Sequence, residues 1–491
     1  MAALAAAEAV ANNDRAPKTI NGYNSKLNKI REWVREMTEE GADDWEWDED
    51  VMSNPPLPDN LVKAFMGKQS QPKDDGSVNV SSTVRGFVSA LKWWYSTESV
   101  FMSDELNQWL SRFNKGHKRK IAELKQNGEM DQHEGKVGFS FTAYVYMASR
   151  LLKEYAADTA YAHAFFVLGW NLIARSVVVS EMRYEFMWLD NDMIVALPPK
   201  QKADQAGERL VGKHICANPF NPEICPWLAL ARHVFSDGDR EEYTKLFPRA
   251  AYDGFGDAFH DLVRTEDARD HLEVAPEKLG KHSTRKGGAT YASSFPGGPG
   301  RDEICQRADW SLGGVRDRYI APVNNGKDQF VARTMAGLDI NSVDYSMLPP
   351  HWTFADTVEV TQRLRGLINV DAYPESFRGC LPLLLASLAY HIDFLDEHLD
   401  PQDRLRMCRA WTSGMQAVET ISGFTFSCRL YLCIVLTMHR CLTTAQAEGC
   451  HRPFTLHIDG HDCNWSSTSC TASCGHSRPE GRAGCEDSRA A

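Results

Sequence analysis

The chain contains 491 residues, 43% of them hydrophobic, and carries a formal net charge of -12 at pH 7. Single hydrophobic cores stop growing near about 250–300 residues, so this length predicts two folded domains and an appendage. The acidic total differs from that of most proteins that bind nucleic acid, which carry a basic surplus. Charge is segregated, however, because residues 39–50 are acidic and residues 112–120 are basic. The net charge therefore excludes a uniformly basic protein but not a local basic surface.

Neither secretion nor membrane insertion is predicted. The start, MAALAAAEAV, lacks the positively charged leader of a secretory signal. No segment reaches about 20 uninterrupted apolar residues, and the best candidate, 424–438, is broken by Arg429. Of the 13 cysteines, only three precede residue 353, scattered without a pairing rhythm: Cys216, Cys225 and Cys305. Such scattered cysteines are typical of a reducing compartment, so we expect a protein that is not secreted and spans no membrane.

The first part of the chain predicts a disordered lead over 1–16 and a small all-helical domain over 17–114. Apolar residues between Tyr23 and Val34 recur at helical spacing and predict a helix near 17–37. Further helical stretches are expected at 61–66, 84–95 and 106–113. The polar segment 115–137 is then expected to be a basic linker. Its cations form either a solvated linker face or a strap that contacts phosphates, and they include Lys115, Lys118, Arg119 and Lys120.

The second domain, 138–352, is expected to be mainly α-helical with one small antiparallel β-sheet. Helices are predicted at 141–156 and 159–173. Apolar runs at 186–189 and 193–197 flank a short turn-forming cluster and therefore predict a β-hairpin, with a further strand at 209–215. Helices are expected again from residue 222 onward.

Composition changes after residue 352, so residues 353–491 are expected to form a C-terminal appendage. Helices are plausible around 380–397 and 404–420, and the end of the chain is low in complexity and expected to be disordered. The tail contains Cys463, Cys470, Cys474 and His476. Structural zinc sites use closely paired ligands. This spacing lacks a paired C-x₂-C arrangement, so no metal site is expected.

One stretch carries the chemistry: 279-LGKHSTRKGGATYASS-294, followed by 304-ICQRADWSLGGVRDRYI-320. His282 and Arg285 are three residues apart, which makes them neighbours on a helical turn. Trp310 precedes Tyr319 by nine residues. This pattern resembles the tyrosine recombinase (phage integrase) family, in which a His-x-x-Arg helix start is followed by a His or Trp and then by the nucleophilic Tyr. The resemblance implies that Tyr319 becomes joined to a DNA 3′-phosphate.

Two upstream segments extend the resemblance to about residues 17–352. The segment 170-WNLIARSVVVSEM-182 resembles the one that bears the family's first active-site Arg, which makes Arg175 the match. Many members place an acidic residue three positions later, where this chain has Val178. The pattern K-x-D-Q-x-G, which starts at Lys202, resembles the hairpin turn that carries the family's Lys, and is most similar to recombinases of eukaryotic Crypton-type mobile elements.

The resemblance implies a role for each residue type. Planar, permanently charged guanidinium groups bind the non-bridging oxygens of a phosphate, which is the role of Arg175 and Arg285. His282 would help to move the tyrosine proton, because an ordinary tyrosine has a pKa of about 10. Lys202, or Lys200 two residues before it, would protonate the departing 5′-oxygen. Trp310 would donate its indole N–H to a phosphate oxygen.

The implied partner is double-stranded DNA, bound between the helical domain 17–114, acting as a core-binding clamp, and the catalytic domain 138–352. The family further implies a homo-oligomer, with a dimer on each site and a tetramer in synapsis. It also implies a nuclear location if the source is eukaryotic and a cytoplasmic one otherwise. No metal, ATP or other cofactor is required, because the covalent link conserves the bond energy. Two alternatives stay open: a type IB topoisomerase, which shares this chemistry, and a domesticated protein that binds DNA without cutting it.

Overall fold

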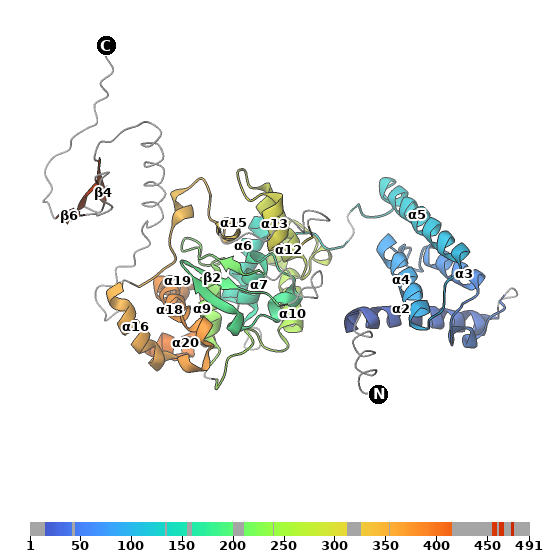
Figure 1. Ribbon diagram of the computed structural model, residues 1–491, viewed down its shortest axis with the longest axis horizontal. Helices are drawn as coiled ribbons and strands as arrows, with labels where there is room; N and C mark the ends of the chain where they lie inside the picture. The colour runs from blue at the N-terminus through green and yellow to red at the C-terminus, as the bar shows by residue number, and fades with distance from the viewer. Residues whose placement is uncertain are drawn as a thin grey trace, which may run out of the picture. The chain divides into compact units, whose positions relative to one another are not determined.

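A computed structural model describes residues 15–41, 45–132, 135–154, 160–199, 211–238, 240–311, 326–352 and 354–414, and three short strands between 454 and 475. The chain divides into two compact units, which are residues 1–135 and 136–491 (Figure 1). Each unit has its own hydrophobic core within the described residues.

The described residues of unit 1 form a bundle of four α-helices with one short 3-10 helix, and the apolar stripes predict these α-helices. Helix α2 begins with a proline, which suits a position without an N–H partner, and ends at Gly41 in the left-handed conformation. Its buried face consists of Leu27, Ile30, Trp33 and Val34. The elements are α2 (Pro17–Glu40), η1 (Glu49–Met52), α3 (Asp59–Gln69), α4 (Ser81–Thr97) and α5 (Asp104–Gln126).

Helix α5 extends into the segment that the sequence predicts to be a linker. The prediction that a linker begins at residue 115 is wrong, because α5 continues without a break to Gln126. The basic run is rich in good helix formers, and His117 and Ile121, which are four residues apart, are both buried. The basic side chains therefore project from a rigid helix of unit 1.

Unit 2 is mainly helical and contains a small antiparallel sheet, which confirms the mainly helical fold with one small sheet that the sequence predicts. The strand order is β1-β2-β3, with β1 (Met187–Asp190), β2 (Met193–Ala196) and β3 (Lys213–Ile215). Asn191 adopts φ 54° at the hairpin turn. The helices are α6 (Phe141–Lys153), α7 (Ala162–Asn171), α8 (Ser176–Ser180), α9 (Pro226–Ser236), α10 (Ala251–Val263), α11 (Glu266–Leu272), α12 (Ser283–Ser294), α13 (Arg301–Arg307) and α15 (Gly326–Met335), with 3-10 turns η2 (Tyr184–Phe186), η3 (Pro276–Lys278) and η4 (Val343–Ser346).

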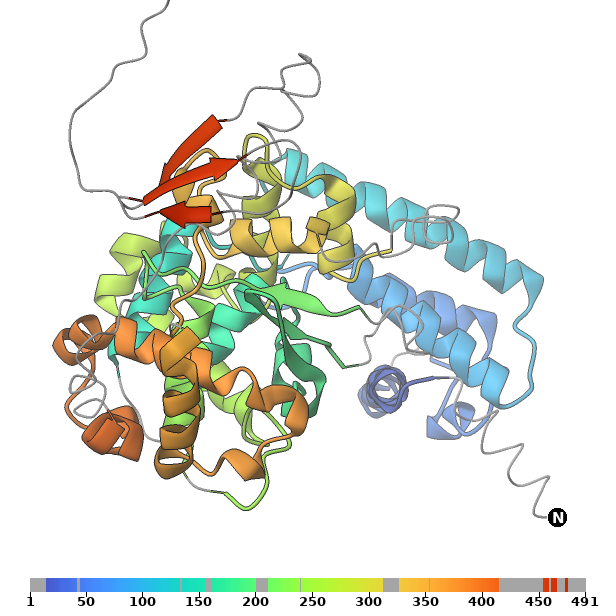
Figure 2. The same cartoon turned by 60° about the vertical axis from the view of Figure 1, so that its left-hand side comes forward.

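Helices after residue 352 belong to the same core. Leu364, Leu384 and Leu388 are buried in the cluster that also contains side chains of α6, α7 and α9. The helical part of the expected appendage therefore packs on the domain before it. The elements are α16 (Phe354–Leu367), η5 (Val370–Ala372), α17 (Glu375–Arg378), α18 (Leu381–Tyr390), α19 (Ile392–His398), α20 (Arg404–Met407) and a π-helical turn (Ala410–Gly414). A second sheet, drawn in red in Figure 2, consists of β4 (Phe454–Ile458), β5 (His461–Trp465) and β6 (Ser473–Gly475).

In the described part of the chain, no single helix is both long and apolar enough to cross a membrane. One pair, 375–390 with 392–398, meets the length and composition test only when its two helices, bent by 64°, are joined.

Helix α7 lies at the centre of unit 2, and all ten of its residues are buried. Trp170 stacks on Tyr144 with ring centroids 4.0 Å apart. Helix α12 packs against α7 through Gly287, where a Cβ atom would lie 2.9 Å from the Trp170 ring of α7 and 2.5 Å from the carbonyl oxygen of Phe139, just before α6. This close approach requires glycine, and it brings the start of α12 beside the end of α7.

Candidate active site

The C-terminus of α7 forms one edge of the candidate site. Ile173 adopts φ 46°, and its N–H donates to the Trp170 carbonyl at 3.0 Å. The N–H of Ala174 donates to the Gly169 carbonyl at 3.0 Å, which completes a Schellman motif. A β-branched residue in the left-handed region is strained. The motif turns the chain so that Arg175 follows immediately, at the start of α8.

The C-terminus of α13 forms the opposite edge with the same motif. Asp309 adopts φ 52°, and its N–H donates to the Gln306 carbonyl at 3.0 Å. The N–H of Trp310 donates to the Cys305 carbonyl at 2.8 Å. Here too, a non-glycine residue occupies the position where glycine is usual.

Arg285 joins the two helix ends. Its Nη1 donates to the Ile173 carbonyl at 2.8 Å, and its Nη2 donates to the Ala308 carbonyl. Carbonyls at helix C-termini carry partial negative charge and so favour a cation. The guanidinium lies 5.4 Å from the centroid of the Trp310 ring, within the range of a cation–π contact. Arg285 is only 5% exposed, whereas Trp310 is 42% exposed, so the indole faces solvent beside a fixed cation.

The neighbours of Arg175 and His282 in the chain are joined by a hydrogen bond. Ser176 Oγ donates to the Lys281 carbonyl at 3.1 Å, and each of the two predicted residues is the next neighbour of one partner. His282 lies at the N-cap of α12, one turn before Arg285. Arg175, which is far from His282 and Arg285 in the sequence, therefore lies in one cluster with them.

Positive charge is concentrated in this cluster. Loss of hydration, together with the charges of Arg175 and Arg285, lowers the pKa of the His282 imidazole. Burial and then the charge of Arg175 lower the pKa of Arg285 to about 10, while Asp309 acts in the opposite direction. Like charges held this close repel one another, so an anion placed between them would be stabilised.

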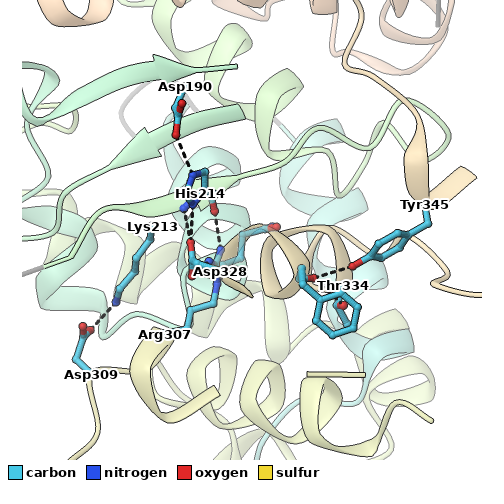
Figure 3. Close-up of polar contacts among 10 residues, drawn as sticks. Asp190, Lys213, His214, Arg307, Asp309, Asp328, Thr334 and Tyr345 are labelled. Carbon is cyan, nitrogen blue, oxygen red and sulfur yellow. Dashed lines mark hydrogen bonds and ion pairs between the residues drawn. The ribbon is translucent and has the colours of Figure 1, made fainter. Parts of the chain in front are cut away.

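Lys213 and Asp309 were not among the residues predicted from sequence. Lys213 Nζ in β3 lies 2.5 Å from Asp309 Oδ2, and the lysine side chain is 3% exposed (Figure 3). Burial lowers the pKa of Lys213, and the negative charge of Asp309 opposes this effect. A lysine inside a predicted buried strand was the available signal, because buried lysines require a partner.

The next residue, His214, belongs to a second buried network on the other side of β3. Its Nδ1 lies 2.9 Å from Asp328 Oδ2, and its Nε2 lies 3.4 Å from Asp190 Oδ2. Arg307 donates to Asp328, to the His214 carbonyl and to the Asn171 carbonyl, at 2.7, 2.7 and 2.9 Å. Figure 3 shows how this network joins β3 to α13 and α15.

The remaining predicted catalytic residues fall outside the described residues. Tyr319 lies within 312–325, and both Lys200 and Lys202 lie within 200–210. Val178, at the position where many members of the family have an acid, is buried. Glu181, one turn away, pairs with Lys245 at 2.7 Å.

The predicted DNA-contacting lysines and arginine lie on α5 of unit 1. Lys115 and Lys118 line a cleft of about 500 Å³ between α5 and the start of α4, together with Arg85, Lys125 and the two serines that open α4. Lys120 instead donates to the Ser70 carbonyl at 2.8 Å. Arg119 is exposed on the same helix and does not line the cleft.

Comparison with known proteins gives little independent guidance. No family model matches the chain, and no curated protein matches it. One solved structure, a complex of a Flpe mutant with a DNA Holliday junction, is similar over 71% of this chain and 99% of that chain, with 9% sequence identity and a TM-score of 0.35.

Proposed function

We propose that this protein cleaves and rejoins DNA strands as a tyrosine recombinase, with Tyr319 as the nucleophile. The observation that supports this most is the gathering of Arg175, His282 and Arg285, three groups that repel one another when charged and that an anion would stabilise together. Their order along the chain, followed by Trp310 and then Tyr319, is the order of the family pattern.

In the proposed reaction, the scissile phosphate binds between the two guanidinium groups. The oxygen of Tyr319 attacks phosphorus, the bond to the 5′-oxygen breaks, and a 3′-phosphotyrosine forms. His282, which a lowered pKa keeps neutral near pH 7, accepts the tyrosine proton. Lys202 donates a proton to the departing 5′-oxygen. Arg175 and Arg285 stabilise the charge that develops on the non-bridging oxygens, a contribution of about 10²–10³ in rate for one such donor.

Unit 1 would hold the DNA through its phosphates. The cleft that contains Arg85, Lys115 and Lys118 offers several cations at one place on α4 and α5. We propose that these residues bind the DNA backbone and that Lys120, which donates to the Ser70 carbonyl and does not line the cleft, does not. Replacing Lys115 and Lys118 by Gln should reduce the slope of log affinity against log salt concentration by about 1–2. Lys120→Gln is the matched control and should leave that slope unchanged.

The central test is capture of the covalent adduct. The full chain is incubated with a pool of nicked duplexes of randomised sequence, protein-linked DNA is recovered under denaturing conditions, and the linked residue is mapped. We expect linkage at Tyr319, and we expect Tyr319→Phe to bind the recovered DNA but form no adduct. An adduct of undiminished yield with Tyr319→Phe would refute the assignment.

The same experiment separates the alternatives. DNA binding without any adduct in the unaltered protein would identify a domesticated protein that no longer cuts. An adduct that leads only to relaxation of supercoiled DNA, with no exchange between two sites, would identify a topoisomerase activity. Exchange between two copies of the recovered site is the result expected of a recombinase, which would assemble as a dimer on each site and a tetramer in synapsis.

A further inference from the structure

A part-buried ion pair, Lys213–Asp309, lies next to the residues that contact Arg285. Lys213 and Asp309 are 3% and 17% exposed, and their charged atoms lie 2.5 Å apart. Asp309 stands between Ala308, whose carbonyl accepts a hydrogen bond from Arg285, and Trp310, whose ring lies over the guanidinium. The ion pair, drawn in Figure 3, therefore ties β3 to the residue whose two neighbours in the chain contact Arg285.

The backbone conformation at Asp309 favours glycine, so the aspartate there needs an explanation from its side chain. Its φ of 52° lies in the left-handed region, where glycine is the usual residue of a Schellman motif. Glycine would relieve the strain but would leave the buried Lys213 without a counter-charge, which is strongly destabilising. Aspartate is among the few other residues that tolerate this conformation. Asp309 thus allows the tight turn and also supplies the carboxylate that pairs with Lys213.

We propose that Asp309, held by Lys213, is a positioning residue that sets the Ala308 carbonyl and the Trp310 ring against Arg285. The inference rests on the proposed function, because it makes the pair part of the support that aims Arg285 at a scissile phosphate. Asp309 is also a negative charge that acts on Arg285, as a bound phosphate would. The carboxylate therefore improves the geometry of the site while reducing its attraction for DNA.

This combination predicts opposite effects of one substitution. Asp309→Asn keeps a residue that tolerates the left-handed turn and removes only the charge. The dissociation constant for DNA should stay the same or fall, because one negative charge has left a positive site. The rate of adduct formation at saturating DNA should fall about 10- to 100-fold, since small displacements of a catalytic group reduce rates on this scale. A residue that merely supports the fold would not separate binding from rate in this way.

The experiment measures single-turnover adduct formation and DNA affinity for the full chain on the DNA recovered by adduct capture. The variants are Asp309→Asn, Lys213→Gln and the double variant, with Asp270→Asn, an exposed carboxylate of α11, as the control with the same charge change. If the residues act as a pair, the double variant should be no slower than the slower single variant. An unchanged rate in a folded Asp309→Asn protein would overturn the proposal, as would equal losses of rate and affinity.

A second readout does not depend on cleavage. With 5-fluorotryptophan incorporated, the ¹⁹F resonance of Trp310 is assigned by its loss in Trp310→Phe. Asp309→Asn should shift or broaden this resonance, whereas Asp270→Asn should not. If the unaltered protein forms no adduct, the proposed function is wrong. The ¹⁹F resonance of Trp310 then tests, without any cleavage, whether Asp309 positions the Trp310 ring. An unshifted, equally sharp resonance in Asp309→Asn would then exclude that role.

Discussion

Replacing Asp328 by Asn should destabilise unit 2, because it removes the counter-charge of a buried arginine. The Arg307 side chain is 0% exposed, and its Nη1 lies 2.7 Å from Asp328 Oδ1. The other carboxylate oxygen accepts from the backbone N–H of His214 at 2.7 Å. Asn has nearly the same shape but only one acceptor oxygen, so one of these two donors loses its partner.

The expected loss is about 3 kcal/mol. Breaking a buried ion pair by removing one charge typically costs about 3–5 kcal/mol. The lower end applies, because Arg307 keeps its hydrogen bonds to the carbonyls of Asn171 and His214. Burial raises the pKa of Asp328, but Arg307 and the hydrogen bonds from His214 outweigh this and lower it well below the ordinary value. The contribution is therefore present above about pH 4 and is lost as the pH falls further.

The measurement is native-state hydrogen exchange of peptides that cover β3 and α13, since tryptophan fluorescence would mix the two units. At pH 7, opening of these peptides should become easier by about 3 kcal/mol in Asp328→Asn, and Asp270→Asn should match the unaltered protein. The difference should narrow in urea unfolding below pH 4. A loss of less than about 1 kcal/mol at pH 7 would refute the claim that this ion pair fastens β3 to α13 and α15.

Three further predictions concern packing, pH and proton donation. In urea unfolding, Gly287→Ala should destabilise unit 2 by more than about 2 kcal/mol, because the new Cβ would lie 2.5 and 2.7 Å from backbone atoms of Phe139. The control Gly22→Ala, at an open helical position, should leave stability unchanged or raise it. Adduct formation should be independent of pH from about 6.5 to 8 and fall only below it, since the pKa of His282 is lowered and its neutral form acts as the base. A fall that begins above pH 7 would contradict this. Lys202→Ala should form the adduct slowly on ordinary DNA but fast when the scissile 5′-oxygen is replaced by sulfur, because a sulfur leaving group needs no proton. Lys213→Ala should stay slow on both substrates. If sulfur restored the rate of Lys213→Ala and not that of Lys202→Ala, Lys213 would be the general acid.

Local patterns in the sequence predict most of the helices and the hairpin. The stripe from Leu27 to Val34 and the apolar runs around the Asn191 turn predicted elements that the structure contains. Helical periodicity and turn residues report on neighbours within a few positions, which is the range over which these elements form. The spacing of His282 and Arg285 likewise indicated that they share one turn of a helix.

The linker shows where local patterns were insufficient. The polar composition of residues 115–126 suggested a linker, but the segment is helical and buries His117 and Ile121. Composition alone does not reveal whether a polar helix has a narrow buried face, because that depends on the element packed beside it. For the same reason, composition did not predict that α16–α20 share a hydrophobic core with α7 and α9.

The site itself required the tertiary structure. Sequence order named Arg175, His282, Arg285 and Trp310, but only the fold shows that Arg285 links the ends of α7 and α13 and that Ser176 bonds to Lys281. The Lys213–Asp309 pair joins residues 96 positions apart. Contacts over such separations are set by how whole elements pack, and no periodicity along one chain encodes them. The sequence by itself therefore determined which residue types the site contains, and the tertiary structure decided which of them hold one another in place.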